Sequence, residues 1–277
     1  MEIGFMQGRL CERVDGKIQA FPWRDWALEF ETAQRLGVRL MEWTLDQERL
    51  YETPLMTKAG RQRIGQLSQA HGVRVLSLTG DCFMQAPFYK AHGAERASLL
   101  KDLNAILDAA QNVGIGYVLI PLVDNGSLTN PDEEAALLEG LLPLRGRLVE
   151  GGLKIVFESD FPAERLARFI ARFPEDAFGI NYDIGNSAAL GYRAAEEIAA
   201  YGPRIDNVHV KDRLLAGTTV PLGTGNADFP EAFAALRKAG YAGHFILQTA
   251  RAEDDDHAGA VARYRDMTQA WWNTHES

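Results

Sequence analysis

The sequence predicts an α/β protein that folds as a (β/α)8 TIM barrel, with a single domain over residues 1–277. Two observations support this prediction. Short apolar segments alternate with longer amphipathic segments eight times along the chain, a pattern typical of parallel strands joined by helices. No break in composition divides the 277 residues, and an α/β barrel of this length is often one domain.

The first four strand–helix units are marked by residues that begin or end helices. Gly37, Gly72 and Gly114 each follow a helical pattern, where glycine readily adopts the left-handed conformation that ends a helix. Pro131 opens the fourth helical pattern, a position where its missing N–H costs nothing. The expected strands are Ile3–Met6, Val38–Trp43, Val73–Leu78 and Tyr117–Ile120, and the expected helices are Trp26–Leu36, Leu55–His71, Ala94–Val113 and Pro131–Glu150.

The last four units repeat this arrangement. The expected strands are Leu153–Phe157, Phe178–Tyr182, Ile205–Val210 and Phe245–Leu247, and the expected helices are Pro162–Phe173, Ala194–Tyr201, Phe229–Ala239 and Ala258–Trp272. A doubly wound open sheet is the alternative fold. That fold usually carries a glycine-rich phosphate turn after its first strand, and the segment from Gly4 to Leu10 lacks the motif, so the barrel is favoured.

Composition and charge disfavour several classes of function. The net charge is −9, from 38 acidic and 29 basic residues, whereas a protein that binds duplex nucleic acid needs a basic surface. Only Cys11 and Cys82 are present, which is typical of a reduced compartment. The N-terminal segment does not resemble a signal peptide, and no apolar run approaches the roughly 18 residues of a membrane helix. We therefore expect a cytoplasmic protein with no nucleic-acid or membrane partner.

Four strands in the second half of the chain end on side chains that can bind a metal. These side chains are Glu158, Asp183, His209 and Gln248, separated by 25, 26 and 39 residues. The active sites of TIM barrels lie at the carboxyl ends of the strands, so the four side chains should converge. Two carboxylates, an imidazole and an amide suit Mn²⁺, Mg²⁺ or Co²⁺, and Zn²⁺ less specifically.

Each of these residues also has a structural interpretation. Glu158 could form a salt bridge, Asp183 could cap the following helix, and His209 could be a hydrogen-bonded core residue. Gln248 taken alone is more simply a hydrogen-bonding amide, and it cannot act as a general base. Only the four residues together favour a metal site.

Four motifs resemble those of the sugar (phosphate) isomerase/epimerase superfamily, the xylose isomerase-like TIM barrels that include ketose 3-epimerases. The motifs are Phe157-Glu158-Ser, Asp183-Ile-Gly-Asn186, His209-Val-Lys-Asp212 and the segment Leu222–Phe229. The resemblance implies one divalent cation (Mn, Mg, Co or Zn) held by Glu158, Asp183, His209 and Gln248. It also implies proton transfer through a metal-bound enediolate, with Glu158 as the main acid/base.

The chain departs from the family pattern at two places. Gln248 replaces the usual second Glu, and Asn186 stands where the family often has His. We expect an isomerase or 3-epimerase of a sugar or sugar phosphate. A metal-dependent sugar or cyclitol dehydratase and a non-catalytic sugar-binding relative remain alternatives because of Gln248. A DNA-repair endonuclease of the related barrel type is disfavoured, since that family binds several zinc ions through many histidines and this chain has six.

Other strand ends supply candidates for substrate binding. Glu42 could bind sugar hydroxyls or provide the missing acid/base, or it could pair with Arg9. Arg213 and Arg251 follow strands seven and eight, where barrels often bind phosphate. The expected substrate-binding residues are Gln7, Arg9, Trp43, Asn186, Lys211, Arg213 and Arg251. A homo-oligomer is expected only by analogy with related barrels.

Overall fold

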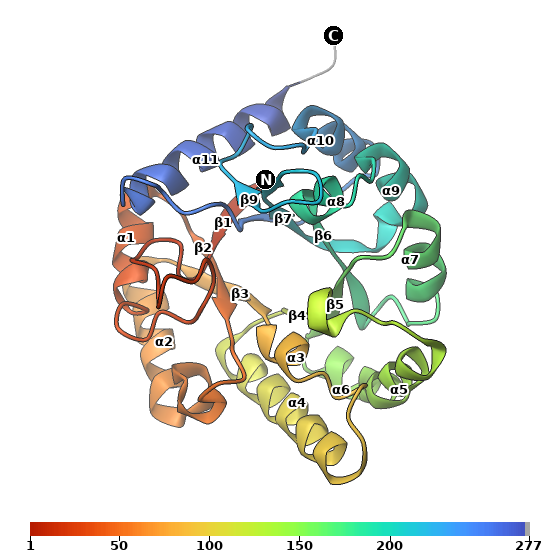
Figure 1. Ribbon diagram of the computed structural model, residues 1–277. Helices are drawn as coiled ribbons and strands as arrows, with labels where there is room; N and C mark the ends of the chain where they lie inside the picture. Colours follow the sequence, from red (N-terminus) through yellow and green to blue (C-terminus); the bar gives the residue numbers. More distant parts are fainter. Residues whose placement is uncertain (275–277) are drawn as a thin grey trace.

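Within residues 1–274, which the computed structural model describes, eight parallel strands close into a barrel with helices around it (Figure 1). The strands follow the order β1-β10-β7-β6-β5-β4-β3-β2 around the barrel. They are β1 (Glu2–Met6), β2 (Leu40–Thr44), β3 (Arg74–Thr79), β4 (Tyr117–Leu122), β5 (Lys154–Ser159), β6 (Phe178–Asp183), β7 (Ile205–Val210) and β10 (His244–Leu247). The predicted (β/α)8 fold class is confirmed. The extension of one domain to residue 277 stays a prediction, because residues 275–277 lie outside the described part.

The helices form the outer layer of the barrel. They are α1 (Leu28–Leu36), α2 (Lys58–His71), α4 (Gly93–Val113), α5 (Pro131–Leu141), α6 (Arg145–Glu150), α7 (Ala163–Ile170), α9 (Ala194–Tyr201), α10 (Phe229–Lys238) and α11 (His257–Asn273). Side chains cap several of their first turns. The Thr57 hydroxyl accepts a hydrogen bond from Gly60 N at 3.0 Å, and Asn130 accepts one from Glu133 N at 3.0 Å. As predicted, Gly37 ends its helix in the left-handed conformation.

Several short elements differ from the predicted pattern. The predicted helix Pro131–Glu150 is divided into α5 and α6 by a 3₁₀ turn over Leu142–Leu144, because Pro143 lacks an N–H and cannot continue an α-helix. Elements that the sequence did not predict are α3 (Asp81–Gln85), α8 (Ile184–Ala189), the antiparallel pair β8 (Asp212–Arg213) and β9 (Thr219–Val220), and the 3₁₀ turns Leu50–Glu52, Pro54–Met56, Asp124–Gly126 and Gly202–Arg204.

The apolar core lies between the strands and the helices. Phe157 on β5 contacts the rings of Phe169, Phe173 and Phe178, at centroid distances of 5.5, 5.0 and 6.3 Å. Each of these rings is almost fully buried, and burying one ring stabilises the fold by about 2–3 kcal/mol. The interior of the barrel is different, because several polar side chains are buried there toward the carboxyl ends of the strands. Among the described residues, none of the helices combines the length and apolar character needed to cross a membrane.

Candidate functional site

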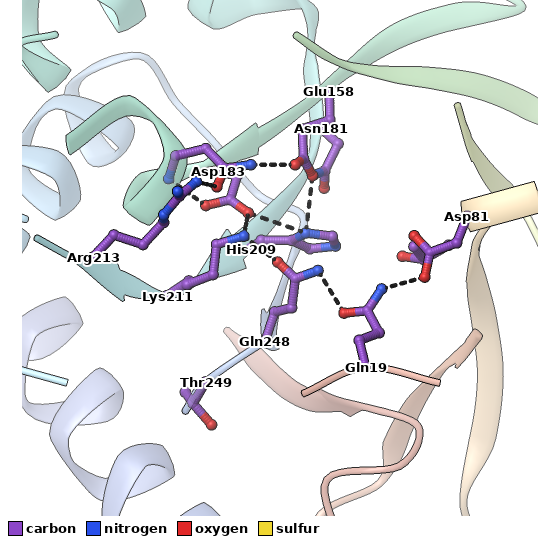
Figure 2. A network of polar contacts seen from close by, with 12 residues as sticks. Gln19, Asp81, Glu158, Asn181, Asp183, His209, Lys211, Arg213, Gln248 and Thr249 are labelled. Carbon is purple, nitrogen blue, oxygen red and sulfur yellow. Dashed lines mark hydrogen bonds and ion pairs between the residues drawn. The ribbon is translucent and has the colours of Figure 1, made fainter. Parts of the chain in front are cut away.

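Three of the predicted metal ligands meet at the carboxyl end of the barrel. Glu158 lies on β5, Asp183 ends β6, and His209 lies opposite Asp183 on the neighbouring strand β7. Their ligand atoms lie within 4.8 Å of one another. His209 Nδ1 is 3.3 Å from Glu158 Oε2 and 3.7 Å from Asp183 Oδ2, and Figure 2 shows the three side chains pointing toward a common space.

The donor atoms of this triad fit a divalent cation. His209 Nδ1 is buried and has no hydrogen-bond partner among residues 1–274, although it faces two carboxylate oxygens. A buried ring nitrogen without a partner is costly unless something absent from the protein chain binds it. Asp183 uses Oδ1 to accept a hydrogen bond from Asn186 N at 2.8 Å, so its other oxygen remains directed at the triad. Two oxygen ligands and one nitrogen suit Mn²⁺, Mg²⁺, Co²⁺ or Zn²⁺.

A buried carboxylate holds the other side of His209. Glu42 Oε1 lies 2.7 Å from His209 Nε2, and the Glu42 carboxylate also accepts hydrogen bonds from Thr79 Oγ1 at 2.5 Å and Asn207 Nδ2 at 3.0 Å. Burial alone would raise the pKa of Glu42, but His209 and the hydrogen bond from Thr79 lower it. Burial lowers the pKa of His209, yet Glu42 and the other carboxylates raise it well above its ordinary value. Carboxylates commonly orient metal-binding histidines in this way.

Gln248 lies beside the triad but is bonded to Lys211. It follows the last residue of β10, and its Oε1 accepts a hydrogen bond from Lys211 Nζ at 2.8 Å. The same ammonium lies 2.7 Å from Asp183 Oδ2. Burial would raise the pKa of Asp183, but Lys211 and His209 lower it to about 2. Lys211 therefore links Gln248 to Asp183.

The site opens into a cavity of about 560 Å³. Among the predicted residues, those that line the cavity are Glu158, Asn186, Lys211, Arg213 and Gln248. Asn186 Nδ2 donates to Glu158 Oε1 at 2.5 Å, and Arg213 Nη1 donates to Asn186 Oδ1 at 2.8 Å. These contacts give the cavity a hydrogen-bonding wall that suits the hydroxyl groups of a small polar ligand.

Other predicted substrate-binding residues lie behind the cavity wall. Gln7 is fully buried, and its Oε1 accepts a hydrogen bond from Thr44 N at 3.2 Å. Trp43 is also fully buried, with its ring 5.5 Å from that of Phe21. Neither residue lines the cavity, and their contact with substrate stays a prediction.

Glu42, Arg9 and Arg251 also do not line the cavity. Glu42 is fully buried, contacts His209 and does not line the cavity, and its role as an acid/base stays a prediction. Its partner is His209 and not Arg9. Arg9 donates to the carbonyls of Thr249 and Ile18, both at 2.9 Å, and Arg251 donates to the carbonyl of Cys11. Backbone carbonyls therefore occupy both guanidinium groups.

Several polar residues of the site escaped sequence analysis. Asp81, which directly follows Thr79 and Gly80 at the end of β3, lines the cavity, and so does Gln19 from the loop after β1. Asn181 Nδ2 donates to Glu158 Oε2 at 2.9 Å from inside the barrel. The rule that polar residues at strand ends face the site would have found Asp81. No pattern pointed to Gln19, since it lies in an irregular loop.

The polar segment after β7 builds a loop. Asp212 is fully buried, and its Oδ2 accepts hydrogen bonds from Gly223 N at 2.9 Å and Gly225 N at 2.8 Å. Its Oδ1 accepts a third from Ala227 N at 3.1 Å. Asp228 then caps α10 through Glu231 N at 2.9 Å. Asp212 therefore shapes this loop and Asp228 caps the next helix, and neither belongs to the triad that could hold a metal.

The barrel and its carboxyl-end site define a protein class. The family model described as xylose isomerase-like TIM barrel matches residues 30–269, so the chain belongs to that family and the predicted resemblance is confirmed. One relative, the L-ribulose-5-phosphate 3-epimerase UlaE of Escherichia coli O1:K1 / APEC, is 25% identical over 254 residues, which cover 88% of this chain and 89% of the relative.

Solved structures share the fold at lower identity. A D-psicose 3-epimerase with D-tagatose from Clostridium cellulolyticum H10 has a TM-score of 0.77 and 11% identity, over 99% of this chain and 100% of that chain. A xylose isomerase domain protein from Planctomyces limnophilus has a TM-score of 0.73 and 18% identity, over 98% of this chain and 96% of the other.

Proposed function

We propose that this protein is a divalent-metal-dependent sugar isomerase or 3-epimerase in which Glu158 is the main acid/base. The observation that carries the proposal is the convergence of Glu158, Asp183 and His209 within 4.8 Å, with Glu158 also lining the cavity. The relatives named as 3-epimerases support an enzyme of the sugar isomerase/epimerase class. A cytoplasmic location, the absence of nucleic-acid partners and a homo-oligomeric state stay predictions.

The residues around Glu158 suit proton transfer at a carbon next to a carbonyl group. Glu158 is 6% exposed and borders the cavity. Asn181 and Asn186 each donate a hydrogen bond to one of its oxygens, at 2.9 and 2.5 Å, which fixes the carboxylate in one orientation. A divalent cation bound by Glu158, Asp183, His209 and Gln248 would supply Lewis-acid polarisation of the carbonyl group.

Charge in the cavity favours a neutral sugar over a sugar phosphate. Lys211 and Arg213 are the cations that line the cavity, and both are already bonded to protein groups. Lys211 contacts Asp183 and Gln248, and Arg213 donates to Gly217 O through Nε at 3.1 Å and through Nη2 at 2.7 Å. The carboxyl groups that line the same cavity are Asp81, Asp124, Glu158 and Asp160. A phosphate group would enter among these carboxylates without a free cation among the described residues.

A dehydratase is the second candidate, and Gln248 is the observation that favours it. Elimination of water needs one base and a metal, whereas epimerisation needs proton transfer on both faces of a carbon. The amide of Gln248 lies where the family supplies its second carboxylate, and it cannot carry a proton. The products distinguish the two reactions, because the dehydratase releases water from the substrate.

The test combines metal binding with a panel of neutral ketoses. We expect titration calorimetry to detect one Mn²⁺ per chain, and an Asp183→Asn variant to weaken this binding at least tenfold. Asp176→Asn, which changes an exposed aspartate outside the cavity, should bind Mn²⁺ as the unchanged protein does. With Mn²⁺ in D₂O, a substrate ketose should gain deuterium at carbon and form its epimer or isomer. Failure to bind any divalent cation, or water loss in place of exchange, contradicts the proposal.

A further inference from the structure

The cavity contains a buried carboxyl group that is not part of the metal triad. Asp81 follows β3 and is 8% exposed, and it lines the cavity together with Glu158. Its Oδ2 accepts a hydrogen bond from Gln19 Nε2 at 2.5 Å. Within residues 1–274, its Oδ1 makes no hydrogen bond, so one oxygen of this carboxyl group remains available in the cavity.

A directed chain of hydrogen bonds joins Asp81 to Gln248 (Figure 2). Lys211 Nζ donates to Gln248 Oε1 at 2.8 Å, Gln248 Nε2 donates to Gln19 Oε1 at 3.0 Å, and Gln19 Nε2 donates to Asp81 Oδ2. An ammonium group can only donate, so it determines the orientation of both amides. Each amide then turns its N–H toward Asp81. The chain therefore ends on a group that must accept, and it fixes the orientation of the Asp81 carboxyl group, which Gln19 links to Gln248.

Other groups of the cavity are less suited to exchange a proton with a bound ligand. Asp160 is only partly buried, and Asp124 is exposed in the 3₁₀ turn after β4. Lys211 is bonded to Asp183 and Gln248. Asp81 combines burial, a free oxygen and a fixed orientation. It projects from β3, whereas Glu158 projects from β5, so the two carboxyl groups approach the cavity from strands that β4 separates.

We propose that Asp81 is the second proton-transferring group of the reaction and supplies the function that Gln248 cannot. This inference rests on the proposed epimerase activity. Glu158 removes the proton from the substrate carbon, and the electron pair of that C–H bond moves into the enediolate. The protonated Asp81 then gives its proton to the same carbon on the opposite face, as the electron pair returns to form the new C–H bond. Glu158 ends protonated and Asp81 ionised, and each exchanges with water before the next turnover.

The surroundings of Asp81 suit this role at neutral pH. Burial raises the pKa of Asp81 to about 7, against the lowering effect of the Gln19 hydrogen bond. Asp46 and Glu158 raise this pKa further, and Arg9 lowers it. A group with a pKa near the working pH is present in both protonation states, as a proton carrier requires.

The test uses the variants Asp81→Asn and Gln248→Glu and the double variant, each loaded with Mn²⁺. Asn keeps an oxygen that can accept from Gln19, so we expect Asp81→Asn to fold with little change in Tm. Its kcat for epimer formation should fall about 100-fold or more, with KM changed less than threefold. In D₂O the variant should still label the substrate at carbon without inverting it, because Glu158 alone returns a deuteron to the original face. Adding Gln248→Glu to Asp81→Asn should raise kcat at least tenfold, because position 248 then carries the carboxylate that the family pattern has there.

Three outcomes overturn the inference. The first is a kcat of Asp81→Asn within threefold of that of the unchanged enzyme. The second is an Asp81→Asn variant that neither labels nor inverts the substrate. The third is a loss of activity in Asp81→Asn that adding Gln248→Glu does not restore. Asp132→Asn, an exposed aspartate on α5, is the control and should keep full activity. If the unchanged enzyme labels no ketose at all, the proposed function itself fails, and that result is distinct from any failure of the variants.

Discussion

Gln248 is the residue of the proposed metal site that departs from the family pattern. Its carbonyl oxygen is a weaker ligand than a carboxylate and is shared with Lys211 at 2.8 Å. We expect Gln248→Glu to tighten Mn²⁺ binding about tenfold, since a full negative charge replaces a dipole beside the cation. Calorimetric titration measures the change. Gln85→Glu adds the same charge at the cavity edge and should leave affinity nearly unchanged. Equal affinity of the two variants would place Gln248 outside the metal's ligand set.

Glu42 acts on the same site through His209. It lies 2.7 Å from Nε2 of the imidazole, and its other contacts hold it rigidly. Glu42→Gln keeps the shape of the side chain but removes the charge that orients and polarises the ring. Because partners of this kind typically contribute 10- to 100-fold to metal affinity, we expect Mn²⁺ to bind about tenfold more weakly or worse. If calorimetry shows unchanged affinity at preserved Tm, the carboxylate does not support the metal ligand.

The residues of the site were only partly predictable. Strand ends indicated Glu158, Asp183 and His209, because one barrel end collects the last residues of all parallel strands. Successive side chains on a strand point to opposite faces, and the sequence alone does not say which face of β2 Trp43 occupies. Tertiary contacts also decide which cations are free. Arg251 follows a strand end as predicted, but a backbone carbonyl binds it.

At the scale of elements, the order of strands and helices followed from hydrophobic periodicity and from glycine and proline positions. The elements that periodicity missed are short. α3 has five residues and α8 has six, so neither presents enough turns for a repeating apolar pattern. Pro143 was visible in the sequence, yet the apolar pattern continues across it and concealed the break between α5 and α6.

The contact between α9 and β6 contains a buried acid that makes stability depend on pH. Burial raises the pKa of Glu197 to about 7, although hydrogen bonds from Ser187, Tyr201 and Tyr182 lower it. A carboxyl group whose folded pKa exceeds its unfolded value stabilises the fold at low pH. This contribution is lost as the pH rises from about 4.5 through 7.

Glu197→Gln should therefore raise Tm more at about pH 8, where the unchanged side chain is ionised, than at about pH 5, where it is protonated. Thermal unfolding at both pH values measures the difference. Glu196→Gln alters an exposed neighbour on the same helix and should show little dependence on pH. A Glu197→Gln effect that is equal at both pH values would mean that the buried acid is not the group that titrates.

At the scale of the whole molecule, the acidic balance seen in the net charge of −9 extends into the cavity. A phosphate ester carries close to two negative charges at neutral pH. Inside the cavity it would meet Asp81, Asp124 and Asp160, while Lys211 and Arg213 are bonded to protein groups. Repulsion of this kind acts both on approach and after binding.

We therefore expect a higher kcat/KM, by about tenfold, for a neutral ketose than for its phosphate ester, as measured in parallel assays with the same metal. Salt screens exposed charges. Raising the ionic strength from about 0.05 to about 0.5 M should therefore increase kcat/KM for the phosphate ester and reduce the difference between the two substrates. Asp124→Asn should also reduce the difference in kcat/KM between the two substrates, because it removes an exposed carboxylate from the cavity wall. A higher kcat/KM for the phosphate ester that decreases with added salt would contradict this expectation. It would show that a cation, with Arg213 as the first candidate, leaves its present partners to bind the ester.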